Sequence, residues 1–140
     1  MTRSQVQSVK ASFQALTPQR NRLAGIFFAQ LFVREPSLRP VFRGDLRAHG
    51  AELFEGLAAI VDSLDRLYPI VPALEWLGVQ SARRGVGERH YEAVLEAMLA
   101  AFRDGLGDGF TAELEAAWRE AAASVSAIMV RAIESEPLAA

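Results

Sequence analysis

The stretch that decides the fold is LRAHGAELFEGLAAIVDSLDRL, residues 46–67, which has the pattern of one long amphipathic helix. Apolar residues and one histidine recur in it at steps of three and four, so they share one helical face. This face contains Leu46, His49, Leu53, Leu57, Ile60, Leu64 and Leu67. Asp45 precedes the stretch and is predicted to cap its first turn. Because His49 belongs to the apolar face, we predict that its imidazole lines a pocket.

The rest of the chain also has helical patterns. Alanine, leucine, glutamate and arginine dominate, no Asn-Gly hairpin signal occurs, and prolines fall where helices could begin. Thr17 and Thr111 are predicted N-caps, and Gly85 suits a left-handed C-terminal turn. We therefore predict an all-α fold with a short turn-like helix bracketed by Pro36 and Pro40. The longer helices are expected over residues 4–16, 18–34, 46–67, 72–84, 88–104 and 112–134.

Length and composition narrow the class of protein. A chain of 140 residues is expected to form one domain, residues 1–140, with a sizeable core. Fifteen basic residues against 17 acidic ones give no field that would favour nucleic acid or an anionic membrane. The chain has no cysteine, which suits a reducing compartment, and no apolar run approaches the roughly 18 residues of a membrane span. We expect a soluble, cytoplasmic protein.

A second helical face is predicted to oppose the first. Leu74, Leu77 and Ser81 follow the same three-and-four spacing in the helix expected over residues 72–84. This places Ser81 on the inner side of its helix. We therefore predict that His49 and Ser81 lie on opposite walls of one pocket.

Four longer motifs carry a resemblance to a known family. They are FFAQLFVREPSLRPVFRGD (residues 27–45), RAHGAEL (47–53), LGVQSARRGVGERHY (77–91) and LGDGFTAELEAAW (106–118). Together they resemble the globin family, specifically the bacterial single-domain globins related to flavohemoglobin heads. The resemblance implies a globin fold, a three-on-three helical sandwich, around a heme pocket. It also implies that Phe28 and Phe42 line the pocket and that His49 faces a bound ligand.

The same resemblance shows where this chain departs from the family. Without gaps over residues 77–91, the iron-binding proximal histidine falls on Ser81, and a neutral serine is not among the usual heme ligands. The nearby His90 lies nine residues further on and is expected at the surface. Ser81 itself is expected to be an ordinary helical residue whose hydroxyl bonds to a backbone carbonyl one turn earlier.

Two positions that would support heme also differ. Tyr91 matches the tyrosine that buttresses the proximal ligand, but the partner glutamate falls on Ile133. Glu52 occupies the position where relatives often carry a basic residue near a heme propionate. Tyr91 is expected to be a core aromatic whose hydroxyl finds a local partner.

Other conspicuous residues have ordinary interpretations. Arg83 and Arg84 are expected to form a solvated helix end, with a smaller chance that they meet an anion or a protein. Trp76 and Trp118 are expected in or near the core.

Three functions follow from these observations. The first is a non-classical globin that acts as a sensor, ligand-binding or interaction domain, with a small apolar ligand, a protein partner or a second copy. The second is a heme protein in which His49 or Tyr91 holds the iron and which binds oxygen or another diatomic gas. The third is nitric oxide dioxygenase or peroxidase chemistry; no catalytic residue is predicted, so the chain is not expected to be an enzyme.

The predicted site is the same for the first two functions. The cofactor is either none or heme, and His49 is the expected metal contact if heme binds. The pocket is expected to be collapsed or occupied, because an empty apolar cavity is costly. The predicted lining residues are Phe28, Phe42, His49, Leu53, Ser81 and Tyr91.

Overall fold

The computed structural model describes residues 1–136, which form six α-helices and short 3-10 helices without any strand. This confirms the predicted all-α class. The α-helices are α1 (Arg3–Leu16), α2 (Arg20–Arg34), α3 (Leu46–Asp62), α4 (Val71–Arg84), α5 (Tyr91–Leu106) and α6 (Ala112–Ser135). The 3-10 helices are η1 (Thr17–Gln19), η2 (Pro36–Phe42), η3 (Tyr68–Ile70), η4 (Glu88–His90) and η5 (Gly107–Gly109).

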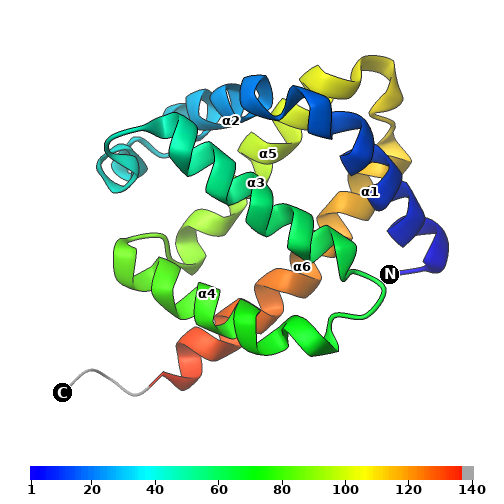
Figure 1. Cartoon of the computed structure of the whole chain (residues 1–140). Coiled ribbons are helices and arrows are strands. Elements are labelled where there is room, and N and C mark those ends of the chain that lie inside the picture. The colour runs from blue at the N-terminus through cyan, green and yellow to red at the C-terminus, as the bar shows by residue number, and fades with distance from the viewer. Residues whose placement is uncertain (137–140) are drawn as a thin grey trace.

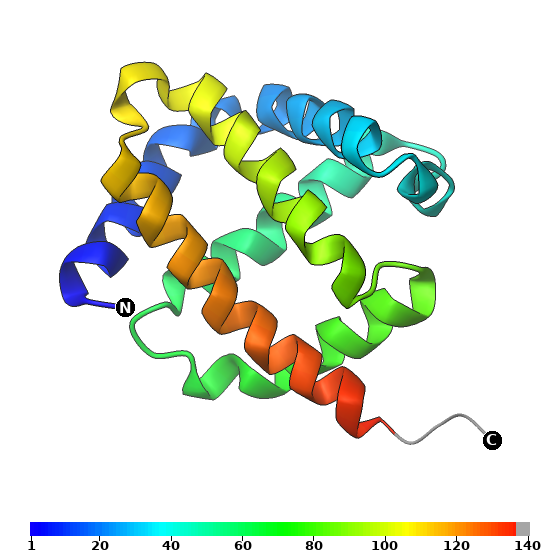
Figure 2. The ribbon, with the colours of Figure 1, turned by 180° about the vertical axis from the view of Figure 1, so that it is seen from behind.

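The helices cross one another in two layers. In Figure 1, α3 runs in front of α5 and α6, and the view from behind shows α5 and α6 in the foreground (Figure 2). The most extensive contacts join α2 to α5 and α4 to α6, and α3 packs on α2. In this arrangement α4 lies against α6, and α3 lies against α2.

Most of the predicted helix ends are confirmed. The Asp45 carboxylate accepts a hydrogen bond from the Arg47 N–H at 3.0 Å, and the Thr111 hydroxyl accepts one from Leu114 at 3.1 Å. Gly85 ends α4 with φ of +109°, a conformation that costs glycine little because it has no Cβ. The Thr17 cap is wrong, because its hydroxyl donates back to the Phe13 carbonyl at 2.8 Å and thereby closes α1.

Helix α3 is shorter than predicted. It ends at Asp62, and Ser63 turns the chain with its N–H bonded to the Ile60 carbonyl at 3.0 Å. The apolar spacing continues past the end of the helix as far as Leu64, and Leu64 is buried although it lies outside α3. Apolar spacing alone therefore extended the helix too far.

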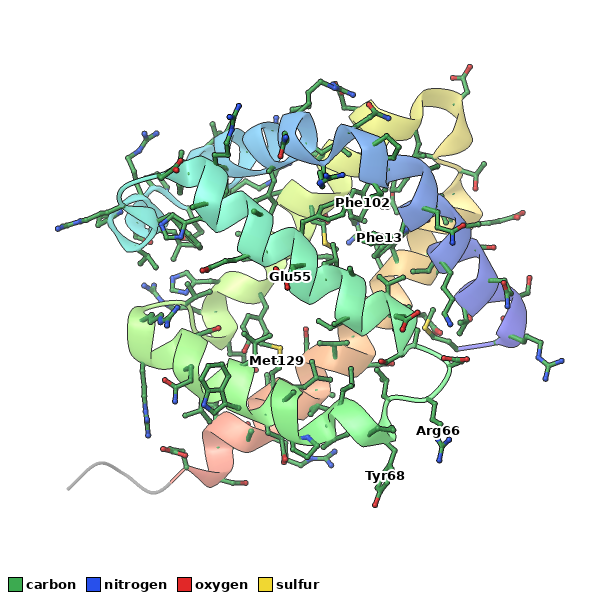
Figure 3. All side chains as sticks on the ribbon, viewed as in Figure 1. Phe13, Glu55, Arg66, Tyr68, Phe102 and Met129 are labelled. Atoms are coloured by element: carbon green, nitrogen blue, oxygen red, sulfur yellow. The ribbon has the colours of Figure 1, made fainter. Side chains whose placement is uncertain are left out.

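The core at the α1 end is built on aromatic side chains. Trp118 is 2% exposed, as predicted, and its indole N–H donates to the Ser12 hydroxyl at 3.0 Å. Phe102 and Phe13 lie 4.7 and 6.4 Å from the Trp118 ring, and both are labelled in Figure 3. Trp118 also joins this aromatic core to the wall of a cavity that lies beside α4.

Helix α4 lies against α6 at a glycine. A Cβ on Gly78 would lie 2.8 Å from the Met129 carbonyl oxygen and 2.9 Å from its Cα. Gly78 therefore lets the two backbones approach more closely than any other residue would allow. Because Ser81 follows one turn later, this contact positions the wall that carries it.

None of the helices within residues 1–136 is long and apolar enough to cross a membrane.

Candidate functional site

A cavity of about 590 Å³ lies between α3 and α4, with α5 and α6 behind it. Its size falls in the range of about 300–1,000 Å³ that holds small molecules and cofactors. Met129, labelled in Figure 3, contributes to the cavity wall from α6. The wall is formed by Phe27, Leu31, Val41, Phe42, His49, Glu52, Leu53, Leu57, Ile60, Val61, Leu64, Trp76, Leu77, Ser81, Arg84, Val86, Tyr91, Val94, Leu95, Met98, Trp118, Ala121, Ala122, Val125, Ser126 and Met129.

The two residues predicted to face each other both line this cavity. His49 reaches it from α3 and Ser81 from α4. Leu53 and Tyr91, also predicted, line it as well. These four residues therefore share one cavity wall, and the binding role of each stays a prediction.

The His49 imidazole is held by the backbone. Its Nε2 lies 2.7 Å from the Arg43 carbonyl oxygen, and because a carbonyl only accepts, Nε2 carries the proton. The edge of the ring meets Phe42, with centroids 5.7 Å apart. The lone pair of the neutral imidazole is therefore on Nδ1, and Nε2 could bind a metal only after leaving Arg43.

Phe28 does not line the cavity, which corrects the prediction for this residue. It is 2% exposed, and its ring lies behind Phe42 at 5.2 Å. Its neighbour Phe27 takes the place in the wall. Adjacent residues on a helix point about 100° apart, so only one of the two phenylalanines faces the cavity. Because both are phenylalanine, the sequence did not show which one.

The Ser81 hydroxyl does not make the expected bond to its own helix. Ser12 and Ser135 bond in this way to carbonyls three and four residues earlier, and Ser81 makes no such bond among the described residues. The Ser81 backbone carbonyl accepts hydrogen bonds at the helix end, from the Val86 N–H at 2.8 Å and from the Gly85 N–H. The small polar side chain is thus left facing the cavity.

Tyr91 has a buried hydroxyl without a partner in the described part of the chain. The expected local partner is therefore wrong, and no carboxylate buttresses this tyrosine, in keeping with the Ile133 assignment. Burial raises the pKa of the phenol, and the nearby Glu88 carboxylate raises this pKa further. Tyr91 accordingly stays protonated at neutral pH, whereas an iron-bound tyrosine is deprotonated.

His90 is buried, contrary to the predicted surface position. It is 3% exposed, and its Nδ1 accepts a hydrogen bond from the Gly87 N–H at 3.0 Å. The ring thus closes the turn before α5, a role that a helix-start position in the sequence could not reveal. His90 is absent from the cavity wall.

The cavity wall keeps large apolar side chains in contact with solvent. Leu53 is 43% exposed, Leu77 38% and Trp76 61%. The core position expected for Trp76 is wrong, and so is the collapsed pocket, because these side chains have not moved inward to fill the space. Exposed apolar surface of this kind marks a ligand-binding or interaction site. The other predicted state, a pocket occupied by a ligand, stays a prediction.

Two charged side chains complete the site. Glu52 lines the cavity from α3 and Arg84 from α4. Arg83 turns away and pairs with Glu136 instead. Sequence reasoning placed both arginines at a solvated helix end, although Arg84 follows Ser81 by three residues and so shares its face.

Within residues 1–136, no group of three or more histidine, aspartate or glutamate side chains could form a metal site. Single donors line the cavity instead, including the thioethers of Met98 and Met129, which sequence reasoning missed. A metal held here would therefore need to arrive with most of its own ligands, as heme iron does.

Comparisons with known proteins agree with this geometry. The globin family model matches residues 26–129. The chain is 27% identical to an anaerobic nitrite reductase of Arabidopsis thaliana, with 86% of this chain and 85% of that protein covered. It is 25% identical to a leghemoglobin of Canavalia lineata, covering 91% of this chain and 92% of the relative. The chain is 24% identical to a flavohemoprotein of Bacillus subtilis. That match covers 83% of this chain and 30% of the flavohemoprotein.

A solved structure gives the same result for the fold. An engineered carbene transferase, described as a putative nitric oxide dioxygenase from Rhodothermus marinus, superposes with a TM-score of 0.83 at 26% identity. The match covers 96% of this chain and 94% of that one. The family model alone spans most of the described helices, from α2 into α6. The chain therefore belongs to the globin family.

Proposed function

We propose that this globin binds heme in the cavity between α3 and α4, with the iron held from the α3 side by His49. The observation that carries the proposal is the open cavity of about 590 Å³ with its exposed apolar walls. A chain that had abandoned its ligand would be expected to cover these walls, because apolar surface left in water costs about 25 cal/mol per Å² relative to burial. The relatives named flavohemoprotein and leghemoglobin support heme as the ligand.

The side chains present fit heme in most respects. Apolar groups from five α-helices, α2 to α6, cover the wall. Tyr91 contributes a ring whose buried hydroxyl has no hydrogen-bond partner within residues 1–136. Ser81 stands where the resemblance places the proximal histidine and offers no donor to iron. Heme, when bound, supplies an iron position at which a diatomic gas such as oxygen can coordinate.

His49 is a better iron ligand than Tyr91. To bind through Nε2, its imidazole gives up one hydrogen bond to Arg43, which costs about 1 kcal/mol. Tyr91 would have to lose a proton whose pKa is already raised by burial and by Glu88. The thioethers of Met98 and Met129 complete the possible donors on the α5 and α6 walls.

Ligand binding or sensing is proposed rather than catalysis. Nitrite reduction and nitric oxide dioxygenation are named for relatives at 27% and 26% identity. Such redox chemistry needs an electron supply, and a strong axial donor such as thiolate pushes electron density onto the iron. The α4 wall provides only Ser81 in that direction.

The test is the absorbance spectrum of the purified protein and of apoprotein mixed with hemin, read at the Soret band of heme. The parent should give a sharp band that changes in His49→Ala and stays unchanged in Tyr91→Phe and in the control Ser81→Ala. A sharp band altered only by Tyr91→Phe would move the ligand to α5. A broad, unsaturable band in the parent would favour the heme-free sensor or interaction domain instead.

A further inference from the structure

The charges on the cavity wall are few and are separated by helix. Of the lining residues in the described part of the chain, Arg84 is the one with a permanent positive charge and Glu52 the one with a negative charge. Arg84 comes from the last turn of α4 and Glu52 from α3, on the facing wall. They form no ion pair with each other. An apolar ligand thus meets a cation at one wall and an anion at the other.

Arg84 is also available to a ligand. Its neighbour Arg83 is fastened to Glu136 at the end of α6, whereas Arg84 has no ion pair within residues 1–136. Its side chain is exposed at the cavity edge, so no buried charge has to be compensated by the protein. A guanidinium in this state matches a carboxylate well, because its planar N–H groups can donate two parallel hydrogen bonds.

We propose that Arg84 binds the carboxylate of an otherwise apolar ligand and so orients it in the cavity. This rests on the proposed function, in which the ligand is heme and the carboxylate is a propionate. Glu52 repels a carboxylate from the α3 wall, so the acidic end of the ligand faces α4. The chemistry recognised is an apolar body with a carboxylate at its edge, which a tetrapyrrole and a fatty acid share.

The experiment uses metal-free protoporphyrin IX, so that iron coordination does not enter. Binding is followed by porphyrin fluorescence in the parent, Arg84→Gln and the matched control Arg83→Gln. Arg84→Gln should weaken binding about 3- to 10-fold. This is less than for a buried charge-assisted hydrogen bond, because solvent screens the charge at an exposed position. Arg83→Gln should change it less than about 2-fold, because its partner is Glu136.

The dimethyl ester of protoporphyrin isolates the carboxylate. The ester should bind the parent and Arg84→Gln equally, and Arg84→Lys should recover part of the affinity for the acid, since it keeps the charge without the planar fork. Equal losses for acid and ester in Arg84→Gln would overturn the proposal, as would an Arg83→Gln effect of the same size. Circular dichroism of each variant checks that the helices are intact.

Two further ligands, palmitate and hemin, show whether the carboxylate belongs to an acyl chain or a porphyrin. They also show whether the inference about Arg84 and the iron assignment fail separately. If palmitate binds with the same dependence on Arg84 while protoporphyrin does not bind, the carboxylate site stands and the ligand is an acyl chain, which contradicts heme. If hemin gives no coordinated spectrum and the Arg84 effect on protoporphyrin persists, the iron assignment fails alone. If hemin coordinates normally and Arg84→Gln has no effect on either porphyrin, the inference about Arg84 fails alone.

Discussion

Replacing Gly78 by alanine should destabilise the protein and loosen the wall that carries Ser81. The added Cβ would lie 2.8 Å from the Met129 carbonyl oxygen and 2.9 Å from its Cα and Cβ. Two of these atoms belong to the backbone of α6, so no rotation of a side chain can relieve the contact. Helices α4 and α6 would have to separate.

The expected magnitude is the difference between two effects. Alanine gains about 0.5–1 kcal/mol over glycine inside a helix, whereas overpacking costs about 1–3 kcal/mol. With the upper part of that cost, the net loss in the free energy of unfolding is about 2 kcal/mol. For a domain of this size each kcal/mol shifts Tm by roughly 3–5 °C, so Tm should fall by about 6–10 °C.

Gly56 provides the matched control. It lies in the middle of α3, and a Cβ there would meet nothing within 4 Å. Gly56→Ala should therefore raise the unfolding free energy by about 0.5–1 kcal/mol. Urea denaturation of both apoprotein variants, followed by circular dichroism, measures the difference. A Gly78→Ala protein as stable as the parent would refute the close approach of α4 and α6.

Four further outcomes are expected. Ser81→His should tighten hemin binding in titrations, yet leave it about 10- to 100-fold short of a fully supported site because no carboxylate buttresses Tyr91; unchanged affinity would mean that α4 does not face the iron. Glu52→Lys should tighten hemin binding further by replacing the repelling charge on the α3 wall, and an unaltered dissociation constant would contradict that placement. Tyr91→Phe should raise the unfolding free energy of the apoprotein by about 1 kcal/mol, because it removes a buried hydroxyl without a partner; a loss of similar size would show that the hydroxyl is bonded. Hydrogen bonds from Arg103 and Arg119 lower the pKa of Glu115 below its ordinary 4.5. The ionised carboxylate therefore stabilises the fold above about pH 4.5, and this contribution disappears as the pH falls through the lowered pKa. In acid unfolding curves, Glu115→Gln should lose less stability between neutral and acid pH than the parent.

The sequence predicted the helical layout well because helix formation here follows local signals. Asp45 and Thr111 cap the helices predicted from their side chains, and Gly85 adopts the left-handed turn that its position required. Periodicity failed at the end of α3, where Leu64 is buried outside the helix. A buried apolar residue at helical spacing therefore does not show that the backbone is still helical at that residue.

The pocket was predicted in outline but not in its details. The three-residue spacing that marked His49 and Ser81 as inward-facing is a local property, and both residues line the cavity. The exposure of Trp76 and the place of Arg84 in the cavity wall depend on the distance between α3 and α4. A local sequence pattern does not predict that distance. The buried His90 likewise depends on a turn conformation, since its ring bonds to the Gly87 backbone.

A crystal structure of the parent protein after reconstitution with hemin would show where the porphyrin binds and which side chain holds the iron. We expect one porphyrin between α3 and α4, with the His49 imidazole released from the Arg43 carbonyl and bound to the iron, and with a porphyrin carboxylate on Arg84. A structure in which the porphyrin lies outside this cavity, or in which His49 keeps its bond to Arg43 while another group holds the iron, would contradict it.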